Sequence, residues 1–196
     1  MPLLRIDSLP QDTLLCVWQM TEADSALPVP NSVDMSAIGS QARKREKQVA
    51  YAMLGLLTGN HELIIEHEPS GKPLVEGYNI SITHTRGWAA MILSRKCRVA
   101  VDVEYNSSRV NKIASRFIRE DEQNDSLERR LVNWCAKETM YKLFSEEDLA
   151  FFNMRVRPYV MSSQGVICAD DLITGQAVSI SYEVNSEFVL AYAQLL

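Results

Sequence analysis

The sequence predicts an α+β protein made of two comparable halves. The order of its elements is the first observation: a strand, a helix and several strands are followed by further helices and then strands again. Composition is the second, because 46% hydrophobic and 23% charged residues in a chain of 196 are typical of a globular protein with a real core. We expect the halves to span residues 1–105 and 106–196, although they share no obvious sequence repeat.

Short apolar and β-branched segments predict the strands of the first half. These segments are Thr13 to Met20, Leu63 to His67, Tyr78 to Thr83, Trp88 to Ser94 and Arg98 to Glu104. A helix is expected from Ser40 to Leu57, because this segment opens polar and basic, becomes apolar and is followed by Gly59. The GKP segment, Gly71 to Pro73, indicates a turn.

Helical periodicity opens the second half, in Val110 to Arg119 and in Leu127 to Phe144. Strands are then expected at Asn153 to Tyr159, Val166 to Ala169, Ala177 to Tyr182 and Phe188 to Gln194. Turn residues at Ser163 to Gly165 and at Gly175 separate them.

Charge and cysteine content exclude some classes of protein. A net charge of −5 argues against nucleic-acid binding, which depends on neutralising phosphates with Lys and Arg. The four cysteines are scattered without metal-ligand spacing, so we expect free, mostly buried thiols. No run of 18 apolar residues predicts a membrane span, and the first residues do not resemble a signal peptide. A cytoplasmic protein is therefore expected.

Two acidic residues, Asp102 and Glu104, lie two apart in a predicted strand. Side chains alternate along a strand, so both carboxylates should project from the same face while Val101 and Val103 point the other way. A pair of carboxylates suits a hard cation. The same spacing also occurs on ordinary solvated strand faces.

The segment NWCAKETMYK repeats an aromatic, an acidic and a basic residue at four-residue intervals. Trp134, Glu138 and Lys142 therefore form one stripe of the predicted helix. This order is not that of a core face. The alternative is a surface ion pair between Glu138 and Lys142 beside a partly buried Trp134.

A histidine between two threonines ends one of the predicted strands. His84, with its neighbouring hydroxyls and the nearby Lys72, makes a plausible cradle for phosphate oxygens. A single histidine is also often a hydrogen-bonded structural residue.

The segments GKP, ITHT, VDVE and WCAKETMYK follow one another between residues 71 and 142. This order resembles the Sfp-type 4'-phosphopantetheinyl transferases, whose pattern runs GKP, an (I/S)SHS-like segment, G(I/V)D(I/V)E and W(S/C)xKE(A/S)xxK. The chain departs from that pattern by small-for-small changes at Thr83, Thr85, Ala100 and Thr139. It also has Tyr51 at about the position where many relatives carry an arginine.

The resemblance implies two pseudosymmetric α+β halves in a monomer. It also implies transfer of the 4'-phosphopantetheine group from coenzyme A to a serine of an apo acyl or peptidyl carrier protein, with release of 3',5'-ADP. By the same resemblance Asp102, Glu104 and Glu138 bind Mg²⁺, and catalysis depends on Glu138, Lys142 and Asp102. The residues implied to bind coenzyme A are Lys72, Thr83, His84, Lys137 and Lys142.

Other functions remain open on the sequence. The same carboxylates serve a different Mg²⁺-dependent phosphotransferase or phosphohydrolase acting on a nucleotide, and a catalytically inactive homologue would bind coenzyme A or a carrier protein without reaction. Which group removes the serine proton is also open, because Glu138 suits a metal ligand, a base acting through water, or both.

Basic residues recur at spacings of 3, 4 and 3 in the predicted helix that follows the acidic pair. They are Arg109, Lys112, Arg116 and Arg119. Such a face either docks an acidic carrier protein or is simply solvated.

Overall fold

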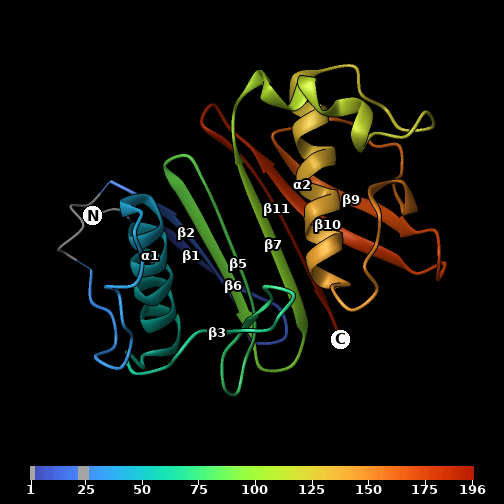
Figure 1. Ribbon diagram of the computed structural model, residues 1–196. Coiled ribbons are helices and arrows are strands. Elements are labelled where there is room, and N and C mark those ends of the chain that lie inside the picture. The colour runs from blue at the N-terminus through green and yellow to red at the C-terminus, as the bar shows by residue number, and fades with distance from the viewer. Residues whose placement is uncertain (1–2, 22–26) are drawn as a thin grey trace. The chain divides into compact units, whose positions relative to one another are not determined.

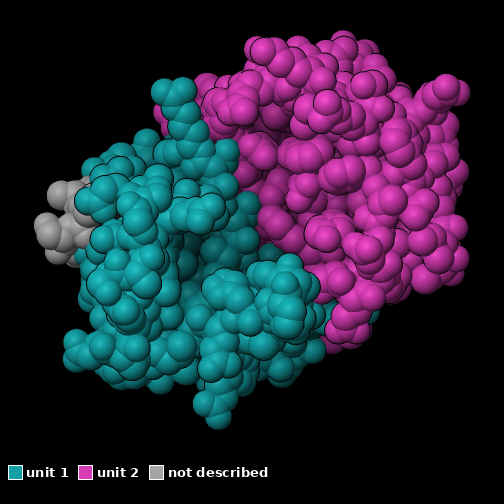
Figure 2. Space-filling view, viewed as in Figure 1, with its two compact units in different colours: residues 1–98 teal, residues 99–196 magenta. Residues whose placement is uncertain are grey.

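The computed structural model describes residues 3–21 and 27–196. The chain forms two compact units, which we call unit 1 (Met1–Arg98) and unit 2 (Val99–Leu196) and which Figure 2 shows in two colours. The division falls at the start of the strand containing Asp102, because that strand belongs to the sheet of unit 2. Each unit has its own helix, sheet and hydrophobic core, so the predicted α+β class is confirmed.

Unit 1 is built on an antiparallel sheet in the order β1-β2-β6-β5 (Figure 1). Its strands are β1 (Leu3–Leu9), β2 (Thr13–Gln19), β5 (Asn79–Thr85) and β6 (Trp88–Ser94). The helix α1 (Gln41–Thr58) packs against β2 and β6. Its buried side chains, including Met53, meet Cys16 and Met91 in the core of this unit.

The strand β1 was not among the elements expected from the sequence. It is an edge strand whose outward-facing Leu4 and Ile6 are exposed, so it lacks the apolar-inside pattern of a buried strand. A tight turn joins it to β2, with Gln11 and Asp12 at φ of 58° and 54°. Positive φ at two consecutive residues matches the right-handed twist of a hairpin.

The helix α1 ends where the sequence predicts. Gly59 adopts φ of 70° and donates its N–H to the carbonyl of Gly55, the usual way in which a glycine closes a helix. Gly55 itself lies against the ring of His61, and a Cβ at this position would come within 2.3 Å of its Nδ1 atom. The glycine thus allows His61 to pack over the last turn.

The connection from α1 to β5 contains a small hairpin. Its strands are β3 (Glu66–His67) and β4 (Pro73–Leu74), so the strand expected at Leu63 to His67 is reduced to two residues. The GKP segment forms the predicted turn, with Gly71 at φ of 90° donating its N–H to the carbonyl of Glu68.

Unit 2 is a five-stranded sheet in the order β7-β11-β10-β9-β8, with the helix α2 (Leu127–Leu143) packed on β8, β10 and β11 (Figure 1). Each strand of this sheet was predicted, some with different ends, although the first of them was expected to belong to the first half. They are β7 (Arg98–Tyr105), β8 (Met154–Val156), β9 (Gln164–Asp171), β10 (Ala177–Val184) and β11 (Phe188–Leu195). Gly165, expected in a turn, lies within β9.

The helix expected at Val110 to Arg119 is not an α-helix. Two short 3₁₀ helices, η1 (Ser108–Lys112) and η2 (Ala114–Arg116), stand in its place. A further 3₁₀ turn, η3 (Phe151–Asn153), precedes β8. Side chains spaced 3, 4 and 3 apart therefore do not share one α-helical face, and the predicted basic stripe is wrong as a geometric statement.

All four cysteines are free thiols, and Cys16, Cys97 and Cys135 are buried, as expected. In residues 3–21 and 27–196, no helix combines the length and the apolar character needed to cross a membrane.

Candidate functional site

The two acidic side chains of β7 lie on the face of the strand that meets α2. Ala100, on the same face, is part of the core of unit 2, whereas Val101 and Val103 point to the other side. Asp102 is 5% exposed and Glu104 is half-buried. The prediction that both carboxylates share a face is confirmed by their contacts with α2.

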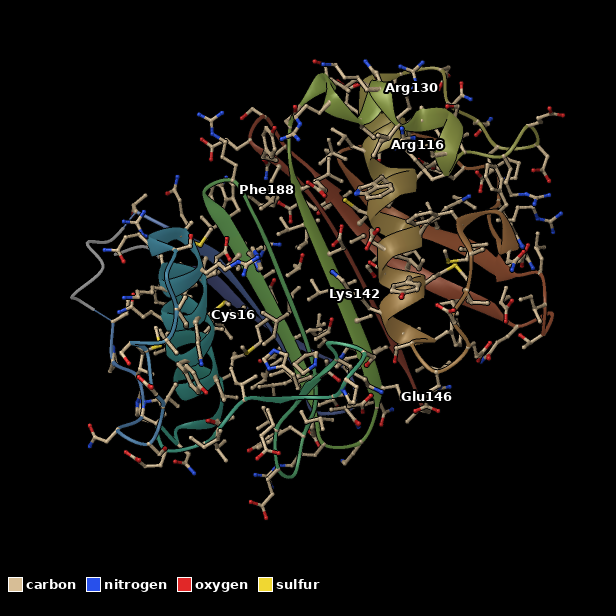
Figure 3. The ribbon with its side chains drawn as sticks, viewed as in Figure 1. Cys16, Arg116, Arg130, Lys142, Glu146 and Phe188 are labelled. Atoms are coloured by element: carbon tan, nitrogen blue, oxygen red, sulfur yellow. The ribbon has the colours of Figure 1, made fainter. Side chains whose placement is uncertain are left out.

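The stripe on α2 faces these carboxylates. The Lys142 Nζ atom donates to Asp102 Oδ1 at 2.7 Å and to the Val101 carbonyl at 3.0 Å. Figure 3 shows Lys142 pointing from α2 toward β7. One end of the stripe is thus tied to Asp102, while at the other end Trp134 Nε1 donates to Glu104 Oε1 at 3.0 Å. Glu138 occupies the helical turn between these two contacts.

The pKa of Glu138 reflects this surrounding. The pKa of Glu138 is raised to about 7, mainly by burial and then by the negative charges of Asp102 and Glu104, while the Lys142 ammonium lowers it. A carboxylate that responds to two others lies within their electrostatic field. The three acidic residues singled out from the sequence therefore form one electrostatic group around α2 and β7.

The donor chemistry of this group suits Mg²⁺, which prefers carboxylate oxygens, and its mutual repulsion is what a divalent cation would relieve. In the described part of the chain, no three His, Cys, Asp or Glu side chains converge closely enough to form a metal site. Protein donors instead hold two of the three acids, through Lys142 on Asp102 and Trp134 on Glu104. Ligand types and charge fit the ion, and these two contacts would have to adjust for all three acids to bind it.

Cys135 lies beside this group, and its thiol is not poised as a nucleophile. Burial raises its pKa well above the ordinary value, and the nearby Asp102 and Glu104 carboxylates raise it further. A thiol held protonated in this way does not take part in nucleophilic chemistry at neutral pH. The chemistry available at this site is therefore that of the carboxylates and of Lys142.

Lys137, predicted to bind coenzyme A, lies elsewhere. Its side chain is 0% exposed and forms an ion pair with Glu122, with 2.9 Å between Nζ and Oε2. A fully buried ammonium does not reach a phosphate in this structure. Sequence analysis missed Glu122, because it belongs to the acidic run of Glu120, Asp121 and Glu122, which is typical of a solvated loop.

The predicted phosphate-binding residues of unit 1 occupy two faces of its sheet. His84 lies on the α1 side of β5, as do Ile80 and Ile82, whereas Thr83 is 6% exposed and points to the opposite side. Lys72 is half-buried in the GKP turn. The structure thus does not bring Thr83 and His84 together on one surface.

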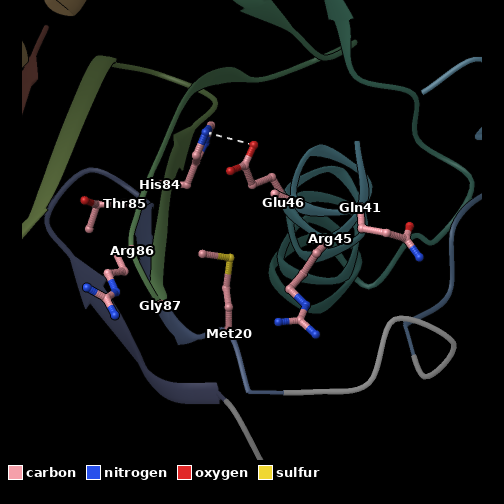
Figure 4. A pocket seen from close by; sticks show the side chains of 9 residues that line it. Met20, Gln41, Arg45, Glu46, His84, Thr85, Arg86 and Gly87 are labelled. Atoms are coloured by element: carbon pink, nitrogen blue, oxygen red, sulfur yellow. Dashed lines mark ion pairs between the residues drawn. The ribbon is translucent and has the colours of Figure 1, made fainter. Parts of the chain in front are cut away.

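His84 borders two hollows of unit 1. The first, about 580 Å³, has an apolar floor that includes Ile65 and Ile82 and a basic rim with Arg43, Lys47 and His67. The second, about 560 Å³, is shown in Figure 4 with Arg45 and Arg86 on its border. Both are also lined by Glu46, whose Oε2 atom lies 3.1 Å from His84 Nε2.

Tyr51, where many relatives carry an arginine, forms part of the wall of the first hollow. It is 4% exposed, and its hydroxyl accepts the N–H of Ile65 at 3.3 Å. This side chain supports the wall and presents no positive charge. Glu46 was missed by sequence analysis because nothing in the spacing along α1 indicates a partner on β5.

The four basic residues after β7 have different surroundings. Arg119 is tied to Asp121 and to the carbonyl of Phe152, whereas Lys112 and Arg116 are exposed. Arg116 lines a hollow of about 430 Å³ together with Glu138 and the exposed Tyr141 and Phe152. One basic side chain of the predicted stripe therefore borders the acidic site.

Neither a known protein-family model nor a curated protein sequence matches this chain significantly.

Proposed function

We propose that this protein is a Mg²⁺-dependent 4'-phosphopantetheinyl transferase, with the two-half fold of that family. In the proposed reaction, a serine of an apo acyl or peptidyl carrier protein receives the phosphopantetheine arm of coenzyme A. The observation that carries the proposal is the pairing of α2 with β7 around Glu138. The side chains of the VDVE and WCAKETMYK segments meet there through the contacts of Lys142 with Asp102 and of Trp134 with Glu104.

The proposed chemistry is a phosphoryl transfer. The serine Oγ attacks the β-phosphorus of coenzyme A. The bond between that phosphorus and the oxygen of the departing 3',5'-ADP breaks, and a base takes up the serine proton. Such reactions are accelerated mainly by positioning and charge neutralisation. Mg²⁺, held by Asp102, Glu104 and Glu138, would neutralise charge on the pyrophosphate.

The side chains themselves support these roles. Glu138, with its pKa raised to about 7, changes charge near neutral pH, which suits a group that accepts a proton or binds a cation. Lys142 already neutralises one carboxylate, and its three N–H donors leave capacity for a phosphate oxygen. Lys137 has no direct role in this proposal, since its ammonium is enclosed.

The nucleotide end of coenzyme A is assigned to unit 1. The first hollow combines an apolar floor, on which a purine can pack, with the basic rim of Arg43, Lys47 and His67 and with His84 beside it. Its volume of about 580 Å³ falls in the range of small-molecule sites. Lys72 is a further candidate for binding the 3'-phosphate of coenzyme A, because its neighbours Gly71 and Pro73 line this hollow.

The test is direct. The purified protein is incubated with coenzyme A, Mg²⁺ and a panel of apo carrier proteins, and the carriers are weighed by mass spectrometry. We expect one carrier to gain the mass of a phosphopantetheine group and 3',5'-ADP to appear in equal amount. A carrier with its acceptor serine changed to alanine is the control and should gain nothing.

Two outcomes would contradict the proposal. Release of 3',5'-ADP without any gain of mass would indicate a hydrolase. Binding of coenzyme A or a carrier without turnover, across the whole panel, would indicate an inactive homologue. In either case Glu138→Ala would leave the transfer measurement unchanged, whereas the proposal expects this variant to abolish transfer while the protein remains folded.

A further inference from the structure

The buried Lys137 ammonium has a complete set of partners. It donates to Glu122 Oε2 at 2.9 Å, to the Phe117 carbonyl at 2.6 Å and to the Phe151 carbonyl at 3.2 Å. These three acceptors use all three donors of the group. Phe117 and Glu122 belong to one loop segment and Phe151 belongs to another, so one side chain of α2 holds two separate loop segments.

Glu122 extends this network. Its Oε2 atom also accepts the N–H of Arg119 at 2.8 Å, and its Oε1 atom accepts the N–H of Val156 at 2.7 Å. The side chains of Lys137 and Glu122 are both 0% exposed. The ion pair therefore joins α2, the segment after η2, the η3 turn and the strand β8.

The two residues that give their carbonyls to Lys137 enclose Trp134 with their rings. The Phe117 ring lies edge-on at 4.9 Å between centroids, and the Phe151 ring lies at 5.2 Å. The indole Nε1 of Trp134 in turn donates to Glu104 Oε1 at 3.0 Å. A continuous set of contacts thus runs from the buried ion pair through two phenylalanines to a carboxylate of the candidate active site.

We propose that the Lys137–Glu122 pair is a positioning device, which fixes Phe117 and Phe151 so that Trp134 holds the Glu104 carboxylate in place. Stability alone does not account for the pair, because apolar side chains of similar volume commonly replace a buried ion pair without loss. What an apolar pair cannot supply is the fixed hydrogen bonding to both carbonyls. The effect on Mg²⁺ rests on the proposed function; the effect on Trp134 does not.

The test is the indole N–H resonance of Trp134 in a ¹⁵N-correlated NMR spectrum, identified by its loss in Trp134→Phe. The main variant is Lys137→Met/Glu122→Gln, which removes both charges, so that no charge stays buried alone. We expect the Trp134 resonance to shift and its hydrogen exchange to accelerate by roughly tenfold or more while the thermal transition stays cooperative. The single variant Lys137→Met should show the same change under any conditions in which it folds.

Tyr159→Phe is the matched control. It removes the hydrogen bond of 3.2 Å from the Tyr159 hydroxyl to the buried Asn133, which lies one turn before Lys137 in α2. The substitution changes none of the contacts described above among Phe117, Phe151 and Trp134. This variant should lose some stability yet keep the Trp134 resonance and exchange rate. Equal disturbance in the control and in the charge-removed variant would overturn the proposal, since the effect would then follow stability alone.

A second measurement addresses the active site. In transfer assays the charge-removed variant and Trp134→Phe should both need roughly tenfold more Mg²⁺ for half-maximal rate, with Tyr159→Phe near wild type. An unchanged Trp134 resonance in the folded charge-removed variant would overturn the positioning role whatever the assay gives. A disturbed resonance in a protein that transfers nothing would leave the positioning role standing and refute only the proposed function.

Discussion

The carboxyl group of Glu138 is half-buried and feels the negative charges of Asp102 and Glu104. Its pKa is raised from 4.5 to about 7, so the folded protein favours the neutral form. The stabilisation of the neutral form is fully present below pH 4.5 and is lost as the pH rises through about 7. The metal-free protein should therefore be less stable at pH 8 than at pH 5 on account of this group.

Replacement of the charge should reverse that loss. In the presence of a chelator at pH 8, we expect Glu138→Gln to raise the free energy of unfolding by about 1–3 kcal/mol and the melting temperature by several degrees. At pH 4 the two proteins should melt almost together, because Glu138 is then mostly protonated in both the folded and the unfolded protein. Thermal scans across this range measure the effect, with the exposed Glu120→Gln as control. If Glu138→Gln raised the melting temperature by the same amount at every pH, ionisation of Glu138 would not be the cause of the lost stability.

His84 and Lys72 lend themselves to a substrate test. If they bind the 3'-phosphate of coenzyme A, which does not react, they stabilise the bound ground state and transition state equally. His84→Ala and Lys72→Ala should then raise KM for coenzyme A roughly tenfold, with little change in kcat. Dephospho-coenzyme A should show no such penalty. The same penalty with both substrates would separate these residues from that phosphate.

Much of the acidic site follows from two periodicities. Residues two apart on a strand share a face, which placed Asp102 and Glu104 together, and residues four apart on a helix do the same for Trp134, Glu138 and Lys142. Long-range partners leave no such local mark. The pairing of Lys137 with Glu122, and that of His84 with Glu46, depend on how separate segments pack, and neither was predicted.

The helices α1 and α2 illustrate what sequence establishes about elements. Both were predicted within a residue or two, α1 from its polar and basic start, its apolar continuation and Gly59, and α2 from its helical periodicity. Val110 to Arg119 has helical spacing as well, yet folds as η1 and η2. Only its buried residues, Val110 and Phe117 among them, are fixed by the core of unit 2, and short 3₁₀ turns satisfy them equally well.

The two helix starts differ in one hydrogen bond, which gives a matched experiment. Ser126 Oγ accepts the N–H of Arg129 at 3.1 Å at the start of α2, whereas Ser40 makes no side-chain cap at the start of α1. Ser126→Ala should therefore lower the free energy of unfolding by about 1 kcal/mol, and Ser40→Ala by much less. Urea unfolding measures both. Equal losses would mean that the cap geometry contributes nothing.

For the whole molecule, distribution of charge matters more than its sum. The chain carries a net charge of −5, yet residues 106–119 contain four basic residues and no acidic one. Arg116 in this segment borders the hollow that contains Glu138, Tyr141 and Phe152. An acidic protein surface would be attracted to this part of unit 2 and repelled by the average charge of the chain.

Reversal of these charges tests whether the segment captures the carrier protein. Basic residues at the edge of an interface act mainly on the association rate, and salt screens them. At low salt, Lys112→Glu/Arg116→Glu should reduce kcat/KM for the carrier roughly tenfold, and the difference should shrink at high salt. KM for coenzyme A should not change.

Arg95→Glu/Lys96→Glu supplies the control, because it alters two exposed bases of the β6–β7 turn and makes the same change in net charge. If net charge alone governed capture, both double variants would slow the reaction equally and show the same salt dependence. If the local field beside Glu138 governs it, only the variant at Lys112 and Arg116 slows. Unchanged kcat/KM and salt slope in that variant would identify η1 and η2 as an ordinary solvated surface.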